Sequence, residues 1–353
     1  MKRTEAAEGG RCLILAVETS CDETSAAVVE NGRVVLSNAV SSQTDAHRRF
    51  GGVVPEIASR KHVETITRMM EIAVEDAGVR LSDLSAVAVT QGPGLVGSLI
   101  VGIAAAKALS LALGVPLIGV HHIAGHIYAA ALVAELEYPA VALVASGGHT
   151  ELILLEAEGR FRHIGRTRDD AAGEAFDKTA RALGLPYPGG PHVDRLAHEA
   201  DGSIPLPRAW LEPDSYDFSF SGLKTAVLTA MREHLQEKTD GVPDPDFVAR
   251  LARGFQEAVI DVLVEKSARA AAAFGARRLI LAGGVAANRG LRTAMSARCA
   301  ELGVPLVVPP PELCTDNAAM IAAAAFLKWK KRRFSPLDIR AEPLFSLEAW
   351  QSE

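Results

Sequence analysis

The sequence predicts an α/β protein made of two duplicated units, and three observations lead to this prediction. Its 353 residues, 48% of them hydrophobic, suffice for two domains that each have a core. Short apolar runs typical of strands alternate with longer stretches of helical periodicity. The pattern of LILAVETSCDETSAAVVENGR returns later in VALVASGGHTELILLEAEGR, with the apolar blocks and both turns in register.

The first unit, residues 12–137, is expected to open with three strands. CLILAVETS forms a buried strand, and TSAAVVENGRVVLSNAV forms two more around a tight turn at Asn31-Gly32. Residues 54–79 have helical periodicity. LSAVAVTQGPG is then a strand that ends in a glycine loop, followed by a long helix from about Val96. VPLIGV is a short strand that leads into the segment HHIAGH.

The second unit, residues 138–334, repeats the three-stranded opening in PAVALVASGGHTELILLEAEGRFRHIGR. Helices are expected at about residues 173–183, 192–199 and 246–274, with SYDFSFSGLKT in a loop. ARRLILAGGVAANRGL is typical of a strand, a glycine turn and a helix start, and residues 316–330 form the last long helix. We therefore predict the actin-like ATPase (ASKHA) architecture, with two ribonuclease-H-like halves and a central nucleotide cleft. An ordinary doubly wound fold with a chance repeat is the alternative.

Residues 1–11 and 335–353 are expected to be tails outside the two units, the first of them flexible. The polar start lacks a signal-type apolar core. The apolar residues 100–113 are interrupted by Lys107, which favours a buried helix over a membrane span. Four cysteines without CxxC spacing fit a reducing cytoplasm. The net charge of −6 argues against a general nucleic-acid coat but allows local basic faces. The candidates for such faces are residues 47–49, 60–62 and 328–333.

His122 and His126 are four residues apart, a spacing that puts two imidazoles on one face of a helix. Together they could bind one divalent cation. Asp316, in a polar turn before an alanine-rich helix, is the best candidate for a third ligand. Such a set of two histidines and one carboxylate leaves positions open for substrate or water. HxxxH spacing alone is common, and a capping or surface role is the competing interpretation.

Two glycine turns that follow strands could hold a nucleotide. In residues 144–148, glycines let backbone N–H groups approach an anion. Residues 282–288 open a helix, whose N-terminus favours negative charge. Asp177 and Asp194 offer carboxylates to ribose hydroxyls. None of these turns is specific alone, and the sequence has no Walker-type GxxxxGK[ST] motif.

Nine motifs occur in one order from residue 18 to about residue 330. They are ETSCDETSAAVV, HRRFGGVVPEIASRKH, QGPGLVGSL, GVHHIAGH, SGGHTEL, DDAAGEAFDKTARALGLPYPGG, FSFSGLKT, AGGVAANR and CTDNAAM. On these motifs the chain resembles the bacterial TsaD (Gcp) family of tRNA N6-adenosine threonylcarbamoyltransferases, once labelled glycoprotein endopeptidases. The resemblance implies transfer of the threonylcarbamoyl group from threonylcarbamoyl-AMP to N6 of adenosine 37 in tRNAs that read ANN codons (t6A formation).

The resemblance also implies roles for individual residues. His122, His126 and Asp316 match the ligands of one divalent metal, Fe²⁺ first and Zn²⁺ as the alternative. The residues that match donor-binding positions are Val144, Ala145, Ser146, Gly147, Gly148, Asp177, Gly190, Asp194 and Asn288. Archaeal and eukaryotic relatives have a tyrosine metal contact where this chain has Val144, so that strand offers no oxygen ligand.

Four residues are candidates for catalysis. Glu18, Asp22 and Glu23 lie at the turn of the first unit, and one of them could orient the substrate or take the proton from N6. The alternative, of equal weight, is that these three acids have no catalytic role and only accept hydrogen bonds within the turn. Ser146 and the turn amides are expected to assist the phosphate or the developing oxyanion. By family analogy Lys224 and the RRF and SRKH segments could contact tRNA.

The implied partners are tRNA, a TsaB-like paralogue that pairs with the first unit, a TsaE-like ATPase and a TsaC-type donor synthase, in the cytoplasm and without a membrane. Three other functions compete. A small-molecule kinase of the same architecture is disfavoured by the histidine pair. A metalloprotease would need a glutamate that HIAGH lacks. A scaffold that only holds nucleotide would not need all three candidate metal ligands.

Overall fold

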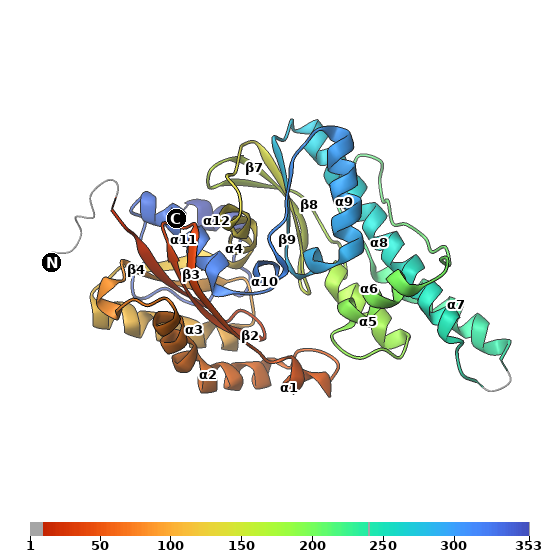
Figure 1. The fold of residues 1–353 in the computed structure, drawn as a ribbon, viewed down its shortest axis with the longest axis horizontal. Coiled ribbons are helices and arrows are strands. Elements are labelled where there is room, and N and C mark those ends of the chain that lie inside the picture. The colour runs from red at the N-terminus through yellow and green to blue at the C-terminus, as the bar shows by residue number, and fades with distance from the viewer. Residues whose placement is uncertain (1–9, 239–240, 353) are drawn as a thin grey trace. The chain divides into compact units, whose positions relative to one another are not determined.

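The computed structural model describes residues 10–238 and 241–352 and divides the chain into two compact units (Figure 1). Of the described residues, unit 1 contains residues 10–47, 53–135 and 312–352. Unit 2 contains residues 48–52, 136–238 and 241–311. Most of the expected flexible tail, residues 1–9, lies outside the described residues.

Unit 1 has a five-stranded sheet of order β3-β2-β1-β4-β5. Its strands are β1 (Leu13–Glu18), β2 (Glu23–Glu30), β3 (Val34–Ser42), β4 (Ala86–Gly92) and β5 (Leu117–His121). The first three are antiparallel neighbours, whereas β4 and β5 run parallel to β1. The predicted hairpin turn is confirmed, because Asn31 (φ 52°) and Gly32 (φ 65°) both adopt the left-handed conformation.

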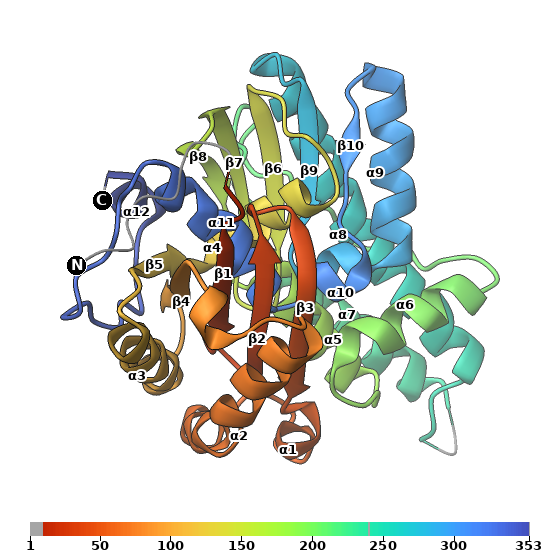
Figure 2. The same ribbon diagram turned by 60° about the vertical axis from the view of Figure 1, so that its left-hand side comes forward.

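Helices cover both faces of this sheet, so its central strands β1 and β4 are buried along their whole length (Figure 2). α2 (Pro55–Asp76) and α3 (Val96–Leu113) pack on one face, and α11 (Ala318–Lys330) packs on the other against β1. α4 (His122–Tyr128) packs on α11. The shorter elements are α1 (Thr44–Arg48), η1 (Leu81–Asp83), η2 (Ala129–Leu132) and α12 (Leu347–Ser352).

α3 buries only one of its faces. Leu99 and Ile103 belong to the core beside α2 and β4, whereas Val96 and Ile100 are each 54% exposed and Leu111 is 69% exposed. The expectation of a buried helix is therefore correct for one face and wrong for the other. Within the described part of the chain, α3 is the one helix long and apolar enough to cross a membrane, a test that core helices also pass.

The expected C-terminal tail is wrong, because this segment packs on unit 1. Trp350 is only 2% exposed, and its Nε1 donates to the Gly119 carbonyl oxygen at 3.0 Å. The chain from residue 312, including α11, also belongs to unit 1 and not to the expected second unit 138–334. Asp316 is consequently a residue of unit 1.

Unit 2 repeats the sheet of unit 1, with order β10-β9-β6-β7-β8. Its strands are β6 (Ala140–Ala145), β7 (Thr150–Ala157), β8 (Arg160–Arg166), β9 (Arg278–Ala282) and β10 (Leu306–Val307). Three antiparallel strands again precede two that run parallel to the first. The same strand order in both units confirms the predicted duplication.

The helices of unit 2 pack around α8 (Pro245–Ala273), which contacts β6 and β9. The other helical elements are α5 (Ala172–Ala182), α6 (Gly189–Glu199), α7 (Ser221–Gln236), η3 (Gly284–Ala287), α9 (Arg289–Leu302) and α10 (Pro311–Cys314), the last of which ends in unit 1. The expectation that all of SYDFSFSGLKT is a loop is wrong from Ser221 onward. The carboxylate of Asp169 accepts hydrogen bonds from the backbone N–H groups of Phe220 and Ser221 and thereby supports the start of α7.

Candidate functional site

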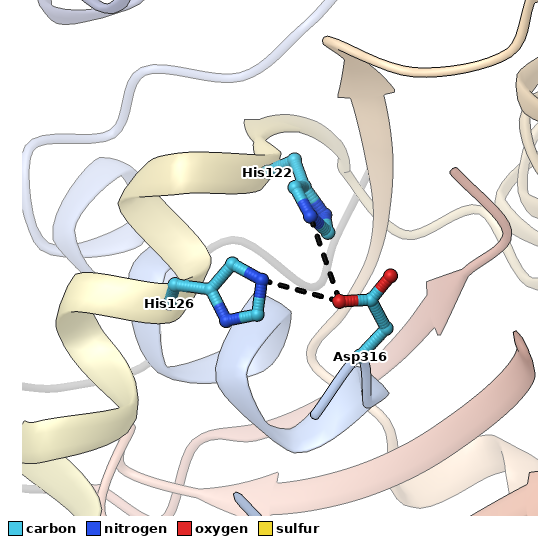
Figure 3. Close-up of side chains that lie close together, drawn as sticks. All are labelled: His122, His126 and Asp316. Atoms are coloured by element: carbon cyan, nitrogen blue, oxygen red, sulfur yellow. Dashed lines mark ion pairs between the residues drawn. The ribbon is translucent and has the colours of Figure 1, made fainter. Parts of the chain in front are cut away.

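Three potential metal ligands meet in unit 1, as Figure 3 shows. His122 and His126 project from the same face of α4 toward Asp316, which lies in the turn before α11. The Oδ1 atom of Asp316 is 3.1 Å from His126 Nε2 and 3.7 Å from His122 Nε2. The side chains of His122 and His126 are 6% and 0% exposed, and that of Asp316 is 19% exposed.

Local capping places both elements of this cluster. His121 ends β5 and caps α4, because its Nδ1 accepts a hydrogen bond from the Ile123 N–H group. Asn317 caps α11 in the same way by accepting from the Met320 N–H group at 3.0 Å. Asp316 is the residue directly before that cap, so the start of α11 fixes its backbone.

The geometry fits a shared cation. Two ligand atoms that are each about 2.0–2.2 Å from one metal ion lie roughly 3.0–3.5 Å apart. Both distances from Asp316 are close to this range, and all three ligand atoms lie within 4.8 Å of one another. Both ring nitrogens of His126 are buried, and apart from the 3.1 Å contact of Nε2 with Asp316 they have no hydrogen-bond partner among the described residues. A buried imidazole of this kind is costly unless another group, such as a metal, coordinates it.

The charges around the two histidines differ. Burial lowers the pKa of His126, although Asp316 acts in the opposite direction. A neutral imidazole is the form that binds a metal. Burial also opposes protonation of His122, but Asp316 and Glu18 outweigh it and raise the pKa of His122 to about 9. A metal ion at this cluster would therefore replace a proton on His122.

Two of the three acidic catalytic candidates, Glu18 and Glu23, have different surroundings. Glu18, at the end of β1, is completely buried and contacts His122, whose influence outweighs burial and lowers the pKa of Glu18. Burial, together with repulsion from Asp22 and Asp316, raises the pKa of Glu23 well above its ordinary value. Glu18 thus contacts a candidate metal ligand, whereas Glu23 is an acid whose surroundings favour its protonated form.

Unit 2 contains a pocket of about 390 Å³. Five of the predicted donor-binding residues line it: Gly147, Asp177, Gly190, Asp194 and Asn288. They come from the turn after β6, from α5, from α6 and from the turn before α9. Segments far apart in the sequence therefore form one concave surface, of a size suited to a small ligand.

Several polar side chains of this pocket already make hydrogen bonds within the protein. Asp177 Oδ1 accepts from the Gly189 N–H group at 2.6 Å. Asn288 caps α9 by accepting from Leu291 N–H at 2.8 Å, while its Nδ2 donates to Gln256 at 2.7 Å. One oxygen of Asp194 accepts from Arg289 at 2.9 Å. The other is buried and has no hydrogen-bond partner among the described residues, so it could accept from a ligand hydroxyl.

Four other predicted donor-binding residues do not line the pocket. Val144 and Ala145 are fully buried in β6. Ser146 is 9% exposed, and its Oγ accepts from the His149 N–H group at 3.1 Å. Gly148 is also outside the pocket lining. The VASGG motif consequently reaches this pocket through Gly147, whereas Ser146 supports the turn.

Several lining residues were not identified individually from the sequence. They are Gly173, Phe176, Pro188, Pro191, Gly284, Val285 and Ala287. All of them lie within GEAFDK, PYPGGPHVD or AGGVAANR. These motifs therefore indicate the region of the pocket, although they do not identify its individual lining residues.

The candidate tRNA contacts are scattered over the two units. Lys224 is exposed on the first turn of α7, and Arg48 and Arg49 are exposed in unit 2. In the SRKH segment of α2, Arg60 and Lys61 pair with neighbouring glutamates and His62 is buried. The SRKH segment therefore offers less unpaired positive charge than its sequence indicates.

Comparisons with known proteins agree over nearly the whole chain. The family model described as "TsaD: tRNA N6-adenosine threonylcarbamoyltransferase" matches residues 34–323. A protein with that enzyme name from Halalkalibacterium halodurans is 60% identical over 338 residues, covering 96% of this chain and 97% of the relative. One from Geobacillus thermodenitrificans is 62% identical over 332 residues, covering 94% of this chain and 95% of the relative.

Solved structures with low sequence identity share the fold. Component A of the (R)-2-hydroxyglutaryl-CoA dehydratase of Acidaminococcus fermentans aligns with a TM-score of 0.53 at 15% identity, covering 91% of this chain and 98% of its own. Full-length HypF aligns with a TM-score of 0.59 at 14% identity, covering 92% of this chain and 47% of its own. These likenesses concern the fold alone and confirm the predicted actin-like ATPase architecture.

Proposed function

The chain belongs to the TsaD family of tRNA N6-adenosine threonylcarbamoyltransferases, and we propose that its donor is threonylcarbamoyl-AMP and its target adenosine 37 in tRNAs that read ANN codons. The family makes it a transferase that modifies tRNA. The donor and the nucleotide position come from the resemblance of its motifs. The convergence of His122, His126 and Asp316 is the structural observation that supports this proposal most strongly.

These three residues would hold one divalent metal, Fe²⁺ in the first instance and Zn²⁺ as the alternative. Two imidazoles and a carboxylate suit both ions. When bound, the metal would act as a Lewis acid on the carbamoyl group and help to anchor the threonyl end. The partial exposure of Asp316 leaves a side of the cluster on which substrate could be bound.

The pocket of unit 2 would bind the adenylate part of the donor. The unpartnered oxygen of Asp194 is suited to a ribose hydroxyl, and the start of α9 favours the negative charge of a phosphate. Asp177, Gly190 and Asn288 shape the same pocket. Backbone and side-chain contacts would then hold AMP, the leaving group. The transfer would be faster because the donor is held in a fixed orientation. Ser146 would act indirectly by holding the turn that presents Gly147.

The amine N6 must lose a proton during transfer. Asp22 and Glu23 are the candidates to receive it, since Glu18 already contacts His122. Burial, together with repulsion from Asp22 and Asp316, raises the pKa of Glu23, and a carboxylate with a raised pKa is a stronger proton acceptor when it is ionised. Lys224, Arg48 and Arg49 would contact tRNA phosphates.

The proposed setting is the cytoplasm, with tRNA as substrate. A TsaB-like paralogue would pair with unit 1. A TsaE-like ATPase and a TsaC-type synthase would act in the same pathway, the synthase by making the donor. These partners follow from the family resemblance.

The direct test is to incubate the purified chain, with and without these partners, with threonylcarbamoyl-AMP and unmodified tRNA. Mass spectrometry of the digested tRNA should detect t6A. A matched tRNA with guanosine at position 37 should remain unmodified. Absence of t6A with every partner combination, alongside phosphate transfer to a small acceptor or peptide cleavage, would support the kinase or the protease instead.

A further inference from the structure

Glu18 is a buried carboxylate that contacts one of the candidate metal ligands, His122. Its side chain is 0% exposed at the carboxyl end of β1. Its Oε2 atom lies 3.1 Å from His122 Nδ1 and accepts a hydrogen bond from Thr90 Oγ1 at 2.5 Å. Its Oε1 atom accepts from the Ser20 N–H group. Both oxygens are thus held in place by separate donors.

The parallel strands explain why these groups meet. β1, β4 and β5 are parallel neighbours, so their carboxyl ends lie at one edge of the sheet. Glu18 ends β1, Thr90 lies near the end of β4, and His122 directly follows β5. The sheet therefore brings the carboxylate, its hydroxyl donor and the imidazole together.

The two nitrogens of His122 face two different carboxylates. Nδ1 lies 3.1 Å from Glu18 and 3.2 Å from the Ser20 hydroxyl, and Nε2 lies 3.7 Å from Asp316 at the candidate metal centre. A neutral imidazole carries one proton, and the nitrogen that hydrogen-bonds a carboxylate holds it. Donation from Nδ1 to Glu18 would leave the lone pair of Nε2 directed toward Asp316 and a shared cation.

His126 lacks an equivalent contact. Its Nδ1 atom is buried and makes no hydrogen bond with the residues that the structure describes. Among the described residues of the cluster, a carboxylate at Nδ1 is consequently found at His122 and not at His126. A buried carboxylate is costly unless its charge has a defined partner, and here that partner is a candidate ligand.

We propose that Glu18 is a positioning residue that holds His122 with Nδ1–H toward Glu18 and Nε2 toward the metal. The proposal rests on the metal site of the proposed function and replaces the expectation that Glu18 acts on the substrate. Carboxylates behind metal-bound histidines typically contribute 10–100-fold to metal affinity. Thr90 has a secondary role, because its hydroxyl orients Glu18.

The test compares metal binding by the full chain and by Glu18→Gln, which keeps the shape but removes the charge. Titration with Zn²⁺ against a chromophoric chelator should show affinity about 10–100-fold weaker for Glu18→Gln. Glu18→Asp, which retains the charge, should recover part of the loss. The matched control is Glu151→Gln, because Glu151 contacts His163 at 2.7 Å in unit 2. This control should bind Zn²⁺ as tightly as the unmodified chain.

Nitrogen NMR of ¹⁵N-histidine-labelled, Zn²⁺-loaded protein reports the tautomer without any assay of activity. His122 should carry its proton on Nδ1 in the unmodified chain, and Glu18→Gln should alter that resonance but not that of His163. If Glu18→Gln does not fold, Thr90→Val should weaken Zn²⁺ binding severalfold, with recovery in Thr90→Ser.

Zn²⁺ affinity in a folded Glu18→Gln protein within twofold of the unmodified chain, with the same His122 tautomer, would overturn the proposal. Unchanged affinity in Thr90→Val would do so if Glu18→Gln is unfolded. An unmodified chain that binds no Zn²⁺, Fe²⁺ or Co²⁺ would instead overturn the metal site of the proposed function. The two failures are therefore distinguishable.

Discussion

The Oδ1 atom of Asp316 lies 3.1 Å from Nε2 of His126, although the two residues are far apart in the sequence. α4 and α11 pack against each other within unit 1, and this packing brings the carboxylate to the histidines. One unit therefore contains all three candidate ligands. The cluster does not depend on the pairing of residues from two units, which the sequence had led us to expect.

Replacing Asp316 with Asn should remove most metal binding. The change keeps the size of the side chain but removes the negative charge that a divalent cation needs. Replacing a residue that only hydrogen-bonds a metal ligand typically lowers metal affinity roughly 10–100-fold. We expect a larger loss of metal affinity for Asp316→Asn, because Asp316 would bind the metal directly. Metal content by plasma mass spectrometry and chelator competition measure this. Asp338→Asn, at an exposed carboxylate of the same unit, is the control. An ion retained at one per chain in Asp316→Asn would show that Asp316 is not a ligand.

Gly283→Ala should disrupt the pocket of unit 2. Gly283 has φ +87°, which strains any residue with a side chain, and a Cβ atom would lie 2.3 Å from the Ala145 carbonyl oxygen. Backbone strain of this kind costs about 1–3 kcal/mol, and the clash adds to it. Chemical denaturation should show the lower free energy of unfolding, and isothermal titration should show weaker AMP binding.

Its neighbour provides the matched control. At Gly284 a Cβ atom would meet nothing within 4 Å, and no positive φ is required. Gly284→Ala should leave the free energy of unfolding within about 0.5 kcal/mol of the unmodified chain. Equal stability of both alanine variants would contradict the role assigned to Gly283.

Asp169→Ala should loosen the start of α7. The carboxylate accepts hydrogen bonds from the N–H groups of Phe220 and Ser221 and from the Ser221 hydroxyl at 2.9 Å. Loss of a cap typically costs about 0.5–2 kcal/mol. Hydrogen exchange should become faster at the first turn of α7, whereas Asp214→Ala, at an exposed aspartate, should change nothing. Unchanged exchange at α7 in Asp169→Ala would refute this role.

Stability should fall below about pH 6.5 because of His62. Burial lowers the pKa of His62, which lies in a network with Thr24 and the Cys21 carbonyl. Below the unfolded-state pKa the unfolded chain binds a proton that the folded chain does not, so stability rises with pH. This contribution is complete above about pH 6.5 and is lost as the pH falls through the lower folded-state pKa.

The expected slope from this one group is at most about 1.4 kcal/mol per pH unit. Urea denaturation at several pH values should show a smaller slope for His62→Gln than for the unmodified chain. His198→Gln, at an exposed histidine of α6, should keep the original slope. Identical slopes for all three proteins would contradict the buried neutral state of His62.

Much of the fold could be predicted because its signals are local. Apolar runs bounded by glycine or Asn-Gly turns predicted β1, β2 and β3, and the repetition of that pattern predicted the opening of unit 2. The spacing of His122 and His126 likewise indicated one helix face. Each of these features depends on residues close together in the sequence.

The remaining features depend on contacts between distant segments. α7 begins where Asp169, from the segment after β8, supports its first N–H groups, so the SFSG sequence alone does not show a helix start. The chain from residue 312 joins unit 1 because α11 packs on β1. Contact between Glu18 and His122 requires the order of the parallel strands, which spacing along the chain does not report.

The most direct test of the account is to titrate Fe²⁺ or Zn²⁺ into metal-free chain and measure bound metal and t6A formation in the same samples, with the partner proteins present. Both should rise together and saturate at one ion per chain, and His126→Ala should show neither. Full t6A formation by metal-free chain, or by His126→Ala without bound metal, would contradict the central claim that His122, His126 and Asp316 hold a metal required for transfer.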